Sequence, residues 1–553
     1  MPEQSRVSPP AEATGAVEGL MQPRPLTIAH ILERAERLYA HKHVTTAGGE
    51  RLTYAEVAGH ARRLATALDS LGVAAGARVA TFASNSRRHL ELYLAVPATK
   101  RVLHSINIRL SAEHLEYIAG HAEDDVVFVD RGLLARIWPS AGKLPRVRYW
   151  VVLADGTDDP IPADPRILDY DELIAGAEPF QGSFEETFEL AEENLASGLC
   201  YTSGTTGPPK GVLYSHRSTI LHCLGTLAAG LIGLRESDVV MPIVPMFHAN
   251  AWGLPYGAMM AGASLVLPGA SAEPAHLLGL METERVTVAG AVPTVWTSLL
   301  PQLRRHDLSA TRFLLGGGSA VPPALSEAYR AALGVPVTHS WGMTEISPVG
   351  AIGGTRTQHR DATEAEQMAV RAAQGQPLPL VNVRIADVET GRELPRDGRA
   401  VGELQVAGPW VAGGYFRTDG GESFTGDGWL RTGDLATIDA HGYLRLVDRM
   451  KDLIKSGGEW ISSVELEAAL SAHPDVVEVA VIARPDPRWM ERPVAYVVVR
   501  EGSAATAEDL TRHLTPRVAK WWLPDEFVFM TTLPKTGTGK LSKTALRESL
   551  RPA

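Results

Sequence analysis

Short apolar runs that alternate with helical segments constrain the fold of this 553-residue chain more than any other feature. The runs are typical of strands buried on both faces of a sheet, and they lie at 77–83, 124–130, 147–154, 238–244, 263–267, 285–292 and 335–338. Segments with apolar residues at helical spacing occur at 26–40 and at 54–72. This alternation predicts an α/β fold with parallel strands in layers.

The pattern changes after residue 380. Between 381 and 408, apolar and polar residues alternate between Gly and Asp turns, which predicts antiparallel strands of a smaller sheet. Near Asp448 a predicted strand runs into a charged segment, and a helix follows whose capping box would join Ser462 and Glu465. We therefore predict three parts: a disordered extension over 1–25, a large domain of α/β layers with a small β-subdomain over 26–447, and a small α+β domain over 448–553.

Composition excludes several function classes. Lys and Arg number 53 against 64 Asp and Glu, so the net charge of −11 argues against a general nucleic-acid or anionic-membrane binder. Only two cysteines occur, Cys200 and Cys223, which removes a disulfide scaffold and suits a reducing cytosol. No apolar run reaches the ~20 residues of a membrane-spanning helix, and the first residues lack a secretory leader. We expect a cytoplasmic protein without an integral membrane segment.

Two Gly/Thr-rich stretches carry lysines about 330 residues apart. The first, "TSGTTGPPKG" (202–211), combines three glycines and four hydroxyls with Lys210, a composition suited to binding phosphate. The second, "LPKTGTGKLS" (533–542), contains Lys535 and Lys540. Neither matches the spacing of a Walker A loop. The alternative is a flexible surface loop, since Gly, Ser, Thr and Pro are ordinary loop residues.

Five segments, taken in order, resemble the signatures of the adenylate-forming (ANL) superfamily, to which acyl-CoA synthetases belong. They are the phosphate-binding loop 202–211, the adenine-side motif "LLGGGSAVPP" (314–323), the aromatic-Gly-x-Thr-Glu motif "HSWGMTEISPV" (339–349), the ribose and hinge segment 431–467, and the terminal lysine motif "PKTGTGK" (534–540). The resemblance extends over about residues 26–550. It implies that the C-terminal domain is mobile and that ATP activates a carboxylic acid.

The resemblance implies a nucleotide site assembled from these motifs. Its residues would be Thr202, Ser203, Gly204, Thr205, Thr206, Gly207, Lys210, Gly316, Gly317, Gly318, Ser340, Trp341, Gly342, Met343, Thr344, Asp434, Arg449 and Lys540. Mg²⁺ would take a hydroxyl and a carboxylate, which the resemblance assigns to Thr202 and Glu345. Read alone, Trp341 could equally be a core tryptophan, and Asp434 with Arg449 a surface salt bridge.

The remaining roles also follow from the resemblance. Lys540 would support adenylate formation in one orientation of the C-terminal domain. A rotation at the hinge residue Lys451 would then bring coenzyme A toward the loop residues Lys455, Gly457, Gly458, Glu459 and Trp460. His248 is a candidate catalytic neighbour of the acyl group, and the acyl pocket and its gate would be formed by His248, Trp252, Val292 and Pro293. A packed core helix is the alternative for the apolar residues of this region.

The implied function is an acid–CoA ligase that uses ATP, Mg²⁺ and coenzyme A, with a medium- to long-chain fatty acid preferred. The stretch "PMFHANAW" (245–252) has no acidic residue, which argues against an amino-acid substrate. Ligases for short or aryl-aliphatic acids, such as methylthiopropionate, and enzymes that load a carrier protein remain alternatives. A luciferase-like oxygenase and a silent nucleotide binder are other classes, and intact Lys540, Glu345 and Asp434 argue against the silent one. The resemblance further implies a homodimer.

Overall fold

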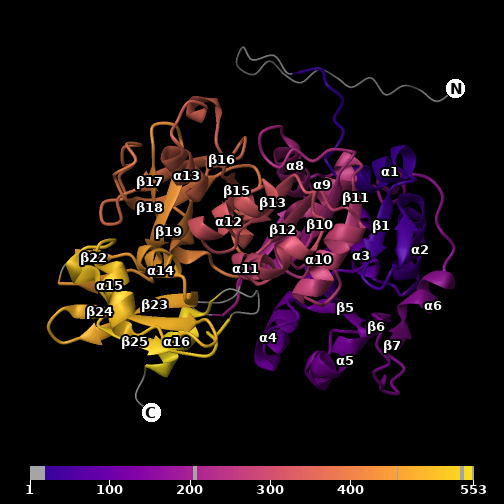
Figure 1. Cartoon of the computed structure of the whole chain (residues 1–553). Coiled ribbons are helices and arrows are strands. Elements are labelled where there is room, and N and C mark those ends of the chain that lie inside the picture. Colours follow the sequence, from indigo (N-terminus) through magenta and orange to yellow (C-terminus); the bar gives the residue numbers. More distant parts are fainter. Residues whose placement is uncertain (1–18, 203–207, 458, 536–540, 551–553) are drawn as a thin grey trace.

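The computed structural model of the chain describes residues 19–202, 208–457, 459–535 and 541–550 (Figure 1). Its large domain contains a seven-stranded sheet in the order β7-β6-β5-β3-β4-β8-β9. The strands are Arg78–Phe82 (β3), Val102–Ser105 (β4), Asp124–Asp130 (β5), Tyr149–Leu153 (β6), Ile167–Asp169 (β7), Ala196–Tyr201 (β8) and Gly211–Ser215 (β9). Only the β8–β9 pair is antiparallel within it.

A nine-stranded sheet runs in the order β16-β15-β14-β13-β12-β10-β11-β1-β2. Its strands are His43–Thr46 (β1), Arg51–Thr53 (β2), Val239–Pro242 (β10), Ser264–Leu267 (β11), Val288–Ala291 (β12), Phe313–Gly316 (β13), Val337–Gly342 (β14), Val349–Ile352 (β15) and Gln376–Pro377 (β16). Along this order, each neighbouring pair of strands from β14 to β1 is parallel. The strand positions predicted from apolar runs are confirmed in both sheets.

Helices form three layers around these sheets. The central layer comprises Ile28–Leu38 (α1), Tyr54–Ser70 (α2), Arg87–Ala98 (α3), His216–Leu227 (α8) and Leu254–Ala261 (α9), and α3 contacts strands of both sheets. Outer layers comprise Ala112–Ala122 (α4) and Arg131–Ile137 (α5) on one side, and Pro274–Thr283 (α10), Pro293–Leu299 (α11) and Pro323–Leu333 (α12) on the other. Both faces of each sheet are therefore covered, which explains the continuous apolar runs. Two short helices, Tyr170–Ala175 (α6) and Phe184–Thr187 (α7), contribute Tyr170, Ile174 and Phe184 to the central core, whereas Glu364–Ala372 (α13) has no buried residue.

A four-stranded antiparallel sheet follows, in the order β17-β18-β19-β20. Its strands are Asn382–Ala386 (β17), Gly402–Ala407 (β18), Leu430–Ile438 (β19) and Leu444–Arg449 (β20). This is the small β-subdomain expected from the alternating pattern. Asp448 lies in β20, and the next strand begins at Ile454.

The C-terminal region combines a five-stranded sheet with three helices (Figure 1). The elements are Ile454–Ser456 (β21), Glu459–Ile461 (β22), Ser463–Ser471 (α14), Val476–Asp486 (β23), Met490–Val499 (β24), Ala507–Leu514 (α15), Glu526–Phe529 (β25) and Lys543–Ser549 (α16). The Ser462 hydroxyl accepts from the Glu465 amide, which is one of the two bonds of the predicted capping box. The predicted α+β class of this part is confirmed.

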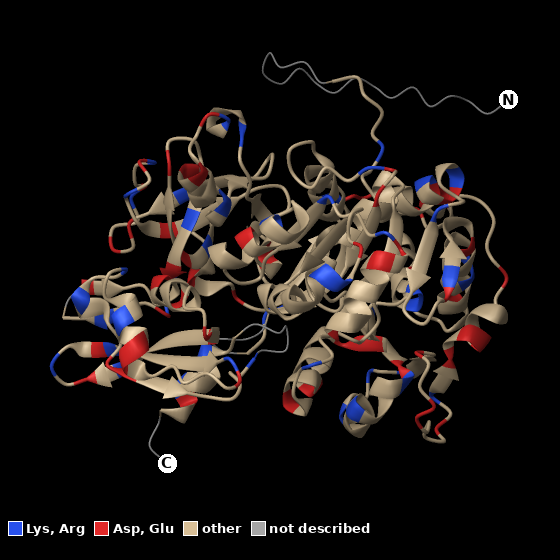
Figure 2. Cartoon of the chain, viewed as in Figure 1, with Lys and Arg blue, Asp and Glu red and all other residues tan. Residues whose placement is uncertain are grey.

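Charged residues of both signs are interspersed over the face shown in Figure 2. In the described ranges, no helix combines the length and the apolar character that a membrane crossing requires.

Candidate active site

The two ends of the predicted phosphate-binding loop are hydrogen-bonded to each other. The Thr202 amide donates to the Lys210 carbonyl at 2.9 Å, and the Lys210 amide donates to the Thr202 hydroxyl at 3.1 Å. These residues follow β8 and precede β9, which are paired antiparallel strands. The strand pair therefore holds the Thr202 hydroxyl and the Lys210 side chain at the same edge of the sheet.

Tyr415 joins the lysine of this loop to the predicted magnesium ligand. The Lys210 ammonium lies 4.6 Å from the centroid of the Tyr415 ring, and the Tyr415 hydroxyl donates to Glu345 Oε1 at 2.9 Å. Lys210 Nζ also donates to the Ser423 hydroxyl at 3.4 Å. The tertiary structure thus brings a cation and a carboxylate from distant motifs against the two sides of one tyrosine.

Glu345 is a buried carboxylate whose neighbours offset the effect of its burial only in part. Its residue is 6% exposed, and burial raises the pKa of its carboxyl, although the Tyr415 hydrogen bond and the charges of Arg449 and Lys210 oppose this. A buried charge of this kind favours a nearby cation. Glu345 and the Thr202 hydroxyl are also the hard oxygen ligands that Mg²⁺ accepts, so these residues fit the ion.

Asp434 is the centre of a second cluster. Trp341 Nε1 donates to Asp434 Oδ2 at 2.9 Å, and Arg449 Nε lies 3.0 Å from Asp434 Oδ1. Asp434 in β19 is paired in register with Arg449 in β20, whereas Trp341 lies in β14 of the nine-stranded sheet. The Asp434 carboxylate therefore lies where the two sheets meet, and it raises the pKa of Arg449.

The glycines of the predicted adenine side leave no room for side chains. A Cβ on Gly317 would lie 2.5 Å from the Ser340 hydroxyl oxygen, and Gly318 has a φ of +83°. Ser340 Oγ donates to the Gly316 carbonyl at 3.1 Å. This bond holds the end of β13 against β14. Glycines at such a position allow a ligand to approach the backbone closely.

The segment after Trp341 is equally tight. A Cβ on Gly342 would lie 1.9 Å from the Pro348 carbonyl oxygen, and the Met343 amide donates to that carbonyl at 3.0 Å. The Tyr214 hydroxyl donates to the Thr344 carbonyl at 2.7 Å. These contacts orient the turn that carries Glu345.

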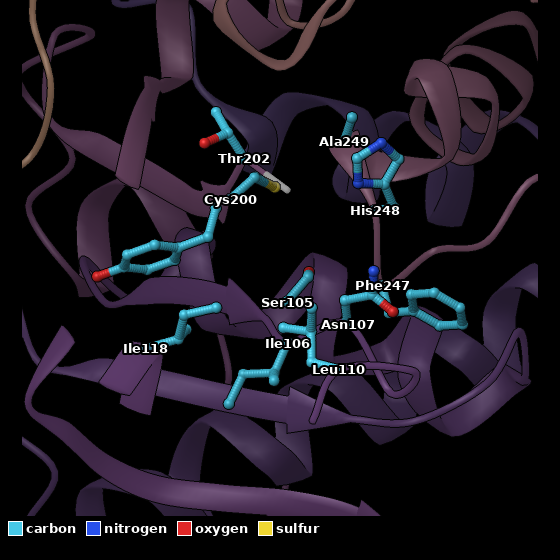
Figure 3. Close-up of a pocket in the computed structure, with 11 residues that line it drawn as sticks. Ser105, Ile106, Asn107, Leu110, Ile118, Cys200, Thr202, Phe247, His248 and Ala249 are labelled. Carbon is cyan, nitrogen blue, oxygen red and sulfur yellow. The ribbon is translucent and has the colours of Figure 1, made fainter. Parts of the chain in front are cut away.

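A cavity lies between Thr202 and His248, which face each other across it in Figure 3. The apolar part of its lining comes from Ile106, Leu110, Ile118, Cys200, Tyr201, Phe247 and Ala249, and the polar part from Ser105, Asn107, Thr202 and His248. No carboxylate side chain is among these lining residues. The predicted phosphate loop and the predicted acyl-side histidine therefore share one cavity.

Trp252 packs beside Gly290 of β12 and beside Gly317 of the predicted adenine side. A Cβ on Gly317 would lie 3.3 Å from its ring, and a Cβ on Gly290 would lie 3.7 Å from it. The ring is carried by a left-handed turn, because φ is +43° to +59° from Ala249 to Trp252. The left-handed turn is confined to Ala249–Trp252, and the segment after it, α9, is a buried helix, so the core-helix alternative is confirmed for residues 254–261. Val292 and Pro293 begin α11, with Val292 partly buried and Pro293 buried.

The residues assigned to coenzyme A do not join this cluster. Lys455, Gly457, Glu459 and Trp460 lie on the β21–β22 hairpin, at the side of the C-terminal domain that faces away from α4 in Figure 1. Lys451 lies between β20 and β21, and Arg547 of α16 donates to its carbonyl at 3.3 Å. The predicted residues that fall outside the described part of the chain are Ser203, Gly204, Thr205, Thr206, Gly207, Gly458 and Lys540.

Tyr415 is the site residue that the motifs did not reveal. It follows the Gly413–Gly414 pair in "GGYF", and the only local signal is an aromatic residue after two glycines. Lys535, the other lysine of the stretch 533–542, is paired with Glu478 at 2.6 Å.

Comparison with known proteins agrees with this geometry. The chain matches the model of the AMP-binding enzyme family over residues 32–416 and that of the AMP-binding enzyme C-terminal domain over residues 465–540. It is 44% identical over 550 residues to a long-chain-fatty-acid–CoA ligase of Thermus thermophilus, covering 98% of each chain. It is 41% identical over 541 residues to a 3-methylmercaptopropionyl-CoA ligase of Ruegeria lacuscaerulensis, covering 97% of this chain and 99% of that one.

A solved structure supports the same grouping. The crystal structure of an anthranilate CoA ligase in complex with anthranoyl-AMP has a TM-score of 0.85 at 27% identity, over 96% of this chain and 99% of that one. Fold and site thus define an adenylate-forming enzyme, and the chain belongs to the AMP-binding enzyme family. Within that family it is an acyl-CoA ligase, an AMP-forming acid–CoA ligase that binds ATP and uses coenzyme A.

Proposed function

We propose that the acid is a medium- to long-chain fatty acid. The observation that carries this proposal is the lining of the cavity shared by Thr202 and His248, which is largely apolar and includes no carboxylate side chain. The cavity volume is about 10 Å³, so an alkyl chain enters it only when side chains of the lining move. An apolar lining favours an alkyl chain, and the missing carboxylate removes a partner for the ammonium group of an amino acid. The acid's carboxylate would then lie near Thr202, where the nucleotide phosphates bind.

In the first half-reaction, a carboxylate oxygen forms a bond to the α-phosphorus of ATP and the bond to pyrophosphate breaks. Lys210 and the hydroxyl-rich loop hold the departing pyrophosphate, and Lys540 neutralises charge between the carboxylate and the α-phosphate. In the second, the thiol of coenzyme A forms a bond to the carbonyl carbon, AMP leaves, and the thiol proton is released. We propose that the C-terminal domain rotates at Lys451 between the two steps.

Mg²⁺ would be held by Glu345 and Thr202 together with the phosphates, and it would supply positive charge opposite the pyrophosphate. Tyr415 keeps one oxygen of Glu345 engaged at 2.9 Å, so the other oxygen would be the one to hold Mg²⁺. Asp434 would accept the ribose hydroxyls, while the Trp341 ring would lie against adenine.

A short thioether acid is the second candidate, and Trp252 is the observation that favours it. Trp252 lies against Gly317 and Gly290 and is 7% exposed. If the acyl chain extends past His248 toward this ring, a short acid binds without displacing Trp252 and a long one displaces it.

Pyrophosphate release with acids of about two to eighteen carbons, and with 3-methylmercaptopropionate, separates these candidates. Trp252→Ala is the diagnostic variant. For a long-chain enzyme we expect the highest kcat/KM between about eight and eighteen carbons, with a further gain for the longest acids in Trp252→Ala. Highest activity on 3-methylmercaptopropionate in both proteins would overturn the fatty-acid proposal. Turnover that never requires coenzyme A would contradict thioester formation.

We propose further that the protein works as a homodimer in the cytosol. The buried free thiols Cys200 and Cys223 support a reducing compartment. Light scattering coupled to size-exclusion chromatography tests the dimer, and a monomeric mass at about 10 µM would reject it. Fractionation of the source cells tests the compartment, and recovery in a membrane or secreted fraction would reject it.

A further inference from the structure

Arg417 joins the segment that carries Tyr415 to the C-terminal end of α4. Its Nη2 donates to Glu123 Oε2 at 2.8 Å, and its Nη1 donates to the His121 carbonyl at 3.3 Å. His121 lies in the last turn of α4, and Glu123 ends the helix in a left-handed conformation, with a φ of +53°. A cation is favoured here because the last carbonyls of a helix carry partial negative charge. Arg417 is therefore bound both to a carboxylate and to the carbonyl end of a helix.

Further contacts hold the same segment. The Phe416 amide donates to the Gly211 carbonyl at 2.8 Å, and the Phe416 ring meets the His121 ring edge-on with 5.8 Å between the centroids. The Arg417 guanidinium carbon lies 4.9 Å from the centroid of the Phe416 ring. Arg417 itself has a φ of +51°, a conformation that costs free energy for a residue with a side chain. Such a conformation persists where surrounding contacts impose it, and here those contacts come from β9 and α4.

The segment reaches the site through Gly413 and Gly414. Before these glycines, the Ala412 amide donates to the Glu345 carbonyl at 2.7 Å. Among the described residues, a Cβ on either glycine would meet nothing within 4 Å, so this stretch is not crowded by its neighbours. The position of Tyr415, the next residue, therefore depends on the contacts of the residues that follow it. Tyr415 in turn donates to Glu345 Oε1 at 2.9 Å.

We propose that Arg417 is a positioning residue for adenylate formation. By binding the end of α4, Arg417 fixes the segment that carries Tyr415, and Tyr415 then holds Glu345 in the orientation that binds Mg²⁺. Arg417 acts through Tyr415 and contacts neither the acid nor ATP. The proposal rests on the proposed function, because it takes Glu345 as a ligand of Mg²⁺.

The end of α4 keeps other partners when Arg417 is removed. Arg78 Nη2 donates to Glu123 Oε2 at 3.2 Å, and Arg78 Nε donates to the Ala122 carbonyl at 2.5 Å. The Arg417 and Glu123 side chains are 42% and 32% exposed, and ion pairs of this kind contribute little to stability. Loss of the Arg417 side chain should therefore release the segment that carries Tyr415 and leave the fold intact.

The test measures ATP–pyrophosphate exchange as the Mg²⁺ concentration is varied. In Arg417→Ala we expect the Mg²⁺ concentration for half-maximal exchange to rise at least about 5-fold, while transfer from supplied acyl-AMP to coenzyme A stays within about 2-fold of the wild type. The melting temperature should change by no more than about 3 °C. Arg417→Lys keeps the charge and should restore most of the wild-type Mg²⁺ dependence. Arg146→Ala is the matched control, because it removes another arginine, 4.0 Å from the Glu123 carboxylate, and should leave the Mg²⁺ dependence unchanged.

A double-mutant comparison shows whether Arg417 acts through Tyr415. Tyr415→Phe keeps the ring and removes the hydroxyl that bonds to Glu345. In that background, Arg417→Ala should raise the half-maximal Mg²⁺ concentration by less than about 2-fold, because the bond that it disturbs is already absent. A rise as large as in the wild-type background would overturn the proposal.

Two other outcomes would also overturn the proposal, namely an unchanged Mg²⁺ dependence in Arg417→Ala and an equal shift in Arg146→Ala. If Arg417→Ala unfolds, Arg417→Gln takes its place, because glutamine keeps much of the side chain's length but cannot form the ion pair. The same shift is then expected, and its absence rejects the role of Arg417. Failure of the proposed function would appear differently, as wild-type exchange that needs no divalent cation or as an unchanged Mg²⁺ dependence in Glu345→Gln.

Discussion

Trp341 donates its indole N–H to Asp434 at 2.9 Å, across the junction between the nine-stranded sheet and the antiparallel subdomain. The bond fixes the edge of the ring and one carboxylate oxygen at the same time. The other oxygen faces Arg449 at 3.0 Å. The residues proposed to contact adenine and ribose are therefore held in fixed positions relative to each other.

Trp341→Phe tests whether the Trp341–Asp434 hydrogen bond orients the nucleotide. The variant keeps an aromatic ring but removes the N–H, so Asp434 loses a partner worth about 1 kcal/mol. We expect KM for ATP to rise about 5-fold, with KM for the acid unchanged, in steady-state kinetics. Trp150→Phe is the control, because Trp150 Nε1 is buried in the outer core without a hydrogen-bond partner. An unchanged KM for ATP would show that the bond does not orient the nucleotide.

Glu345→Gln should lower the activity of the enzyme and change the pH dependence of its stability. Adenylate formation should fall about 100-fold, because the carboxylate that faces the cation is lost. Burial raises the pKa of Glu345, so the folded protein keeps this proton to a higher pH than the unfolded chain does. The free energy of unfolding therefore falls as pH rises through the raised pKa. Glutamine has no charge to bury. In thermal melts without ligand, the melting temperature of the variant minus that of the wild type should therefore be more positive at pH 8 than at pH 5. A variant that is less stable by the same amount at both values would contradict this.

Gly342→Ala should destabilise the protein severely. The new Cβ would lie 1.9 Å from the Pro348 carbonyl oxygen, and backbone on both sides must move. We expect a loss of at least about 3 kcal/mol in the free energy of unfolding, measured with urea. Gly279→Ala in α10, where a Cβ meets nothing within 4 Å, should instead stabilise by about 0.5–1 kcal/mol. A mild effect at Gly342 would mean that this turn is adaptable.

Buried histidines should make the protein labile in acid. Burial lowers the pKa of His222 to about 3, and that of His89, His216 and His339 to about 4. The unfolded chain binds protons below about pH 6.5 that the folded chain refuses, so stability falls as pH falls from 6.5 toward 4. Each histidine contributes up to about 1.4 kcal/mol per pH unit.

His222→Gln tests this directly. His222 Nε2 accepts from the Val349 amide at 3.2 Å, so the variant should be less stable at pH 7.5. Urea titrations between pH 7.5 and 5 should nevertheless show a shallower decline in its free energy of unfolding. A decline as steep as that of the wild type would mean that His222 is not kept neutral by the fold.

Lys540→Ala should impair one half-reaction alone. We expect adenylate formation to fall about 100- to 1000-fold, while transfer from supplied acyl-AMP to coenzyme A survives. Lys535→Ala is the control, since Lys535 pairs with Glu478 and should not affect either step. Gly458→Leu should show the opposite pattern to Lys540→Ala. Equal loss of both half-reactions in Lys540→Ala would contradict the proposal that the C-terminal domain adopts a different orientation for each half-reaction.

The α/β class, the position of buried strands and the antiparallel subdomain could be predicted from the sequence. Each depends on local periodicity, because a strand buried on both faces must be apolar throughout, and a half-exposed strand must alternate. The order of the motifs likewise indicated an adenylate-forming enzyme. The same order predicts Lys210, Glu345, Trp341 and Asp434 as site residues from their positions in the motifs alone.

Only the tertiary structure decided how those residues meet. Tyr415 lies between Lys210 and Glu345, and Trp341 bonds to Asp434 93 positions further along the chain. The tertiary structure also brought Thr202 and His248 into one cavity and left Trp489 exposed beside Gly457. Local sequence determines which backbone conformation and which face a residue prefers. Contacts between distant segments depend on the order and register of strands in the sheets, which no local pattern encodes.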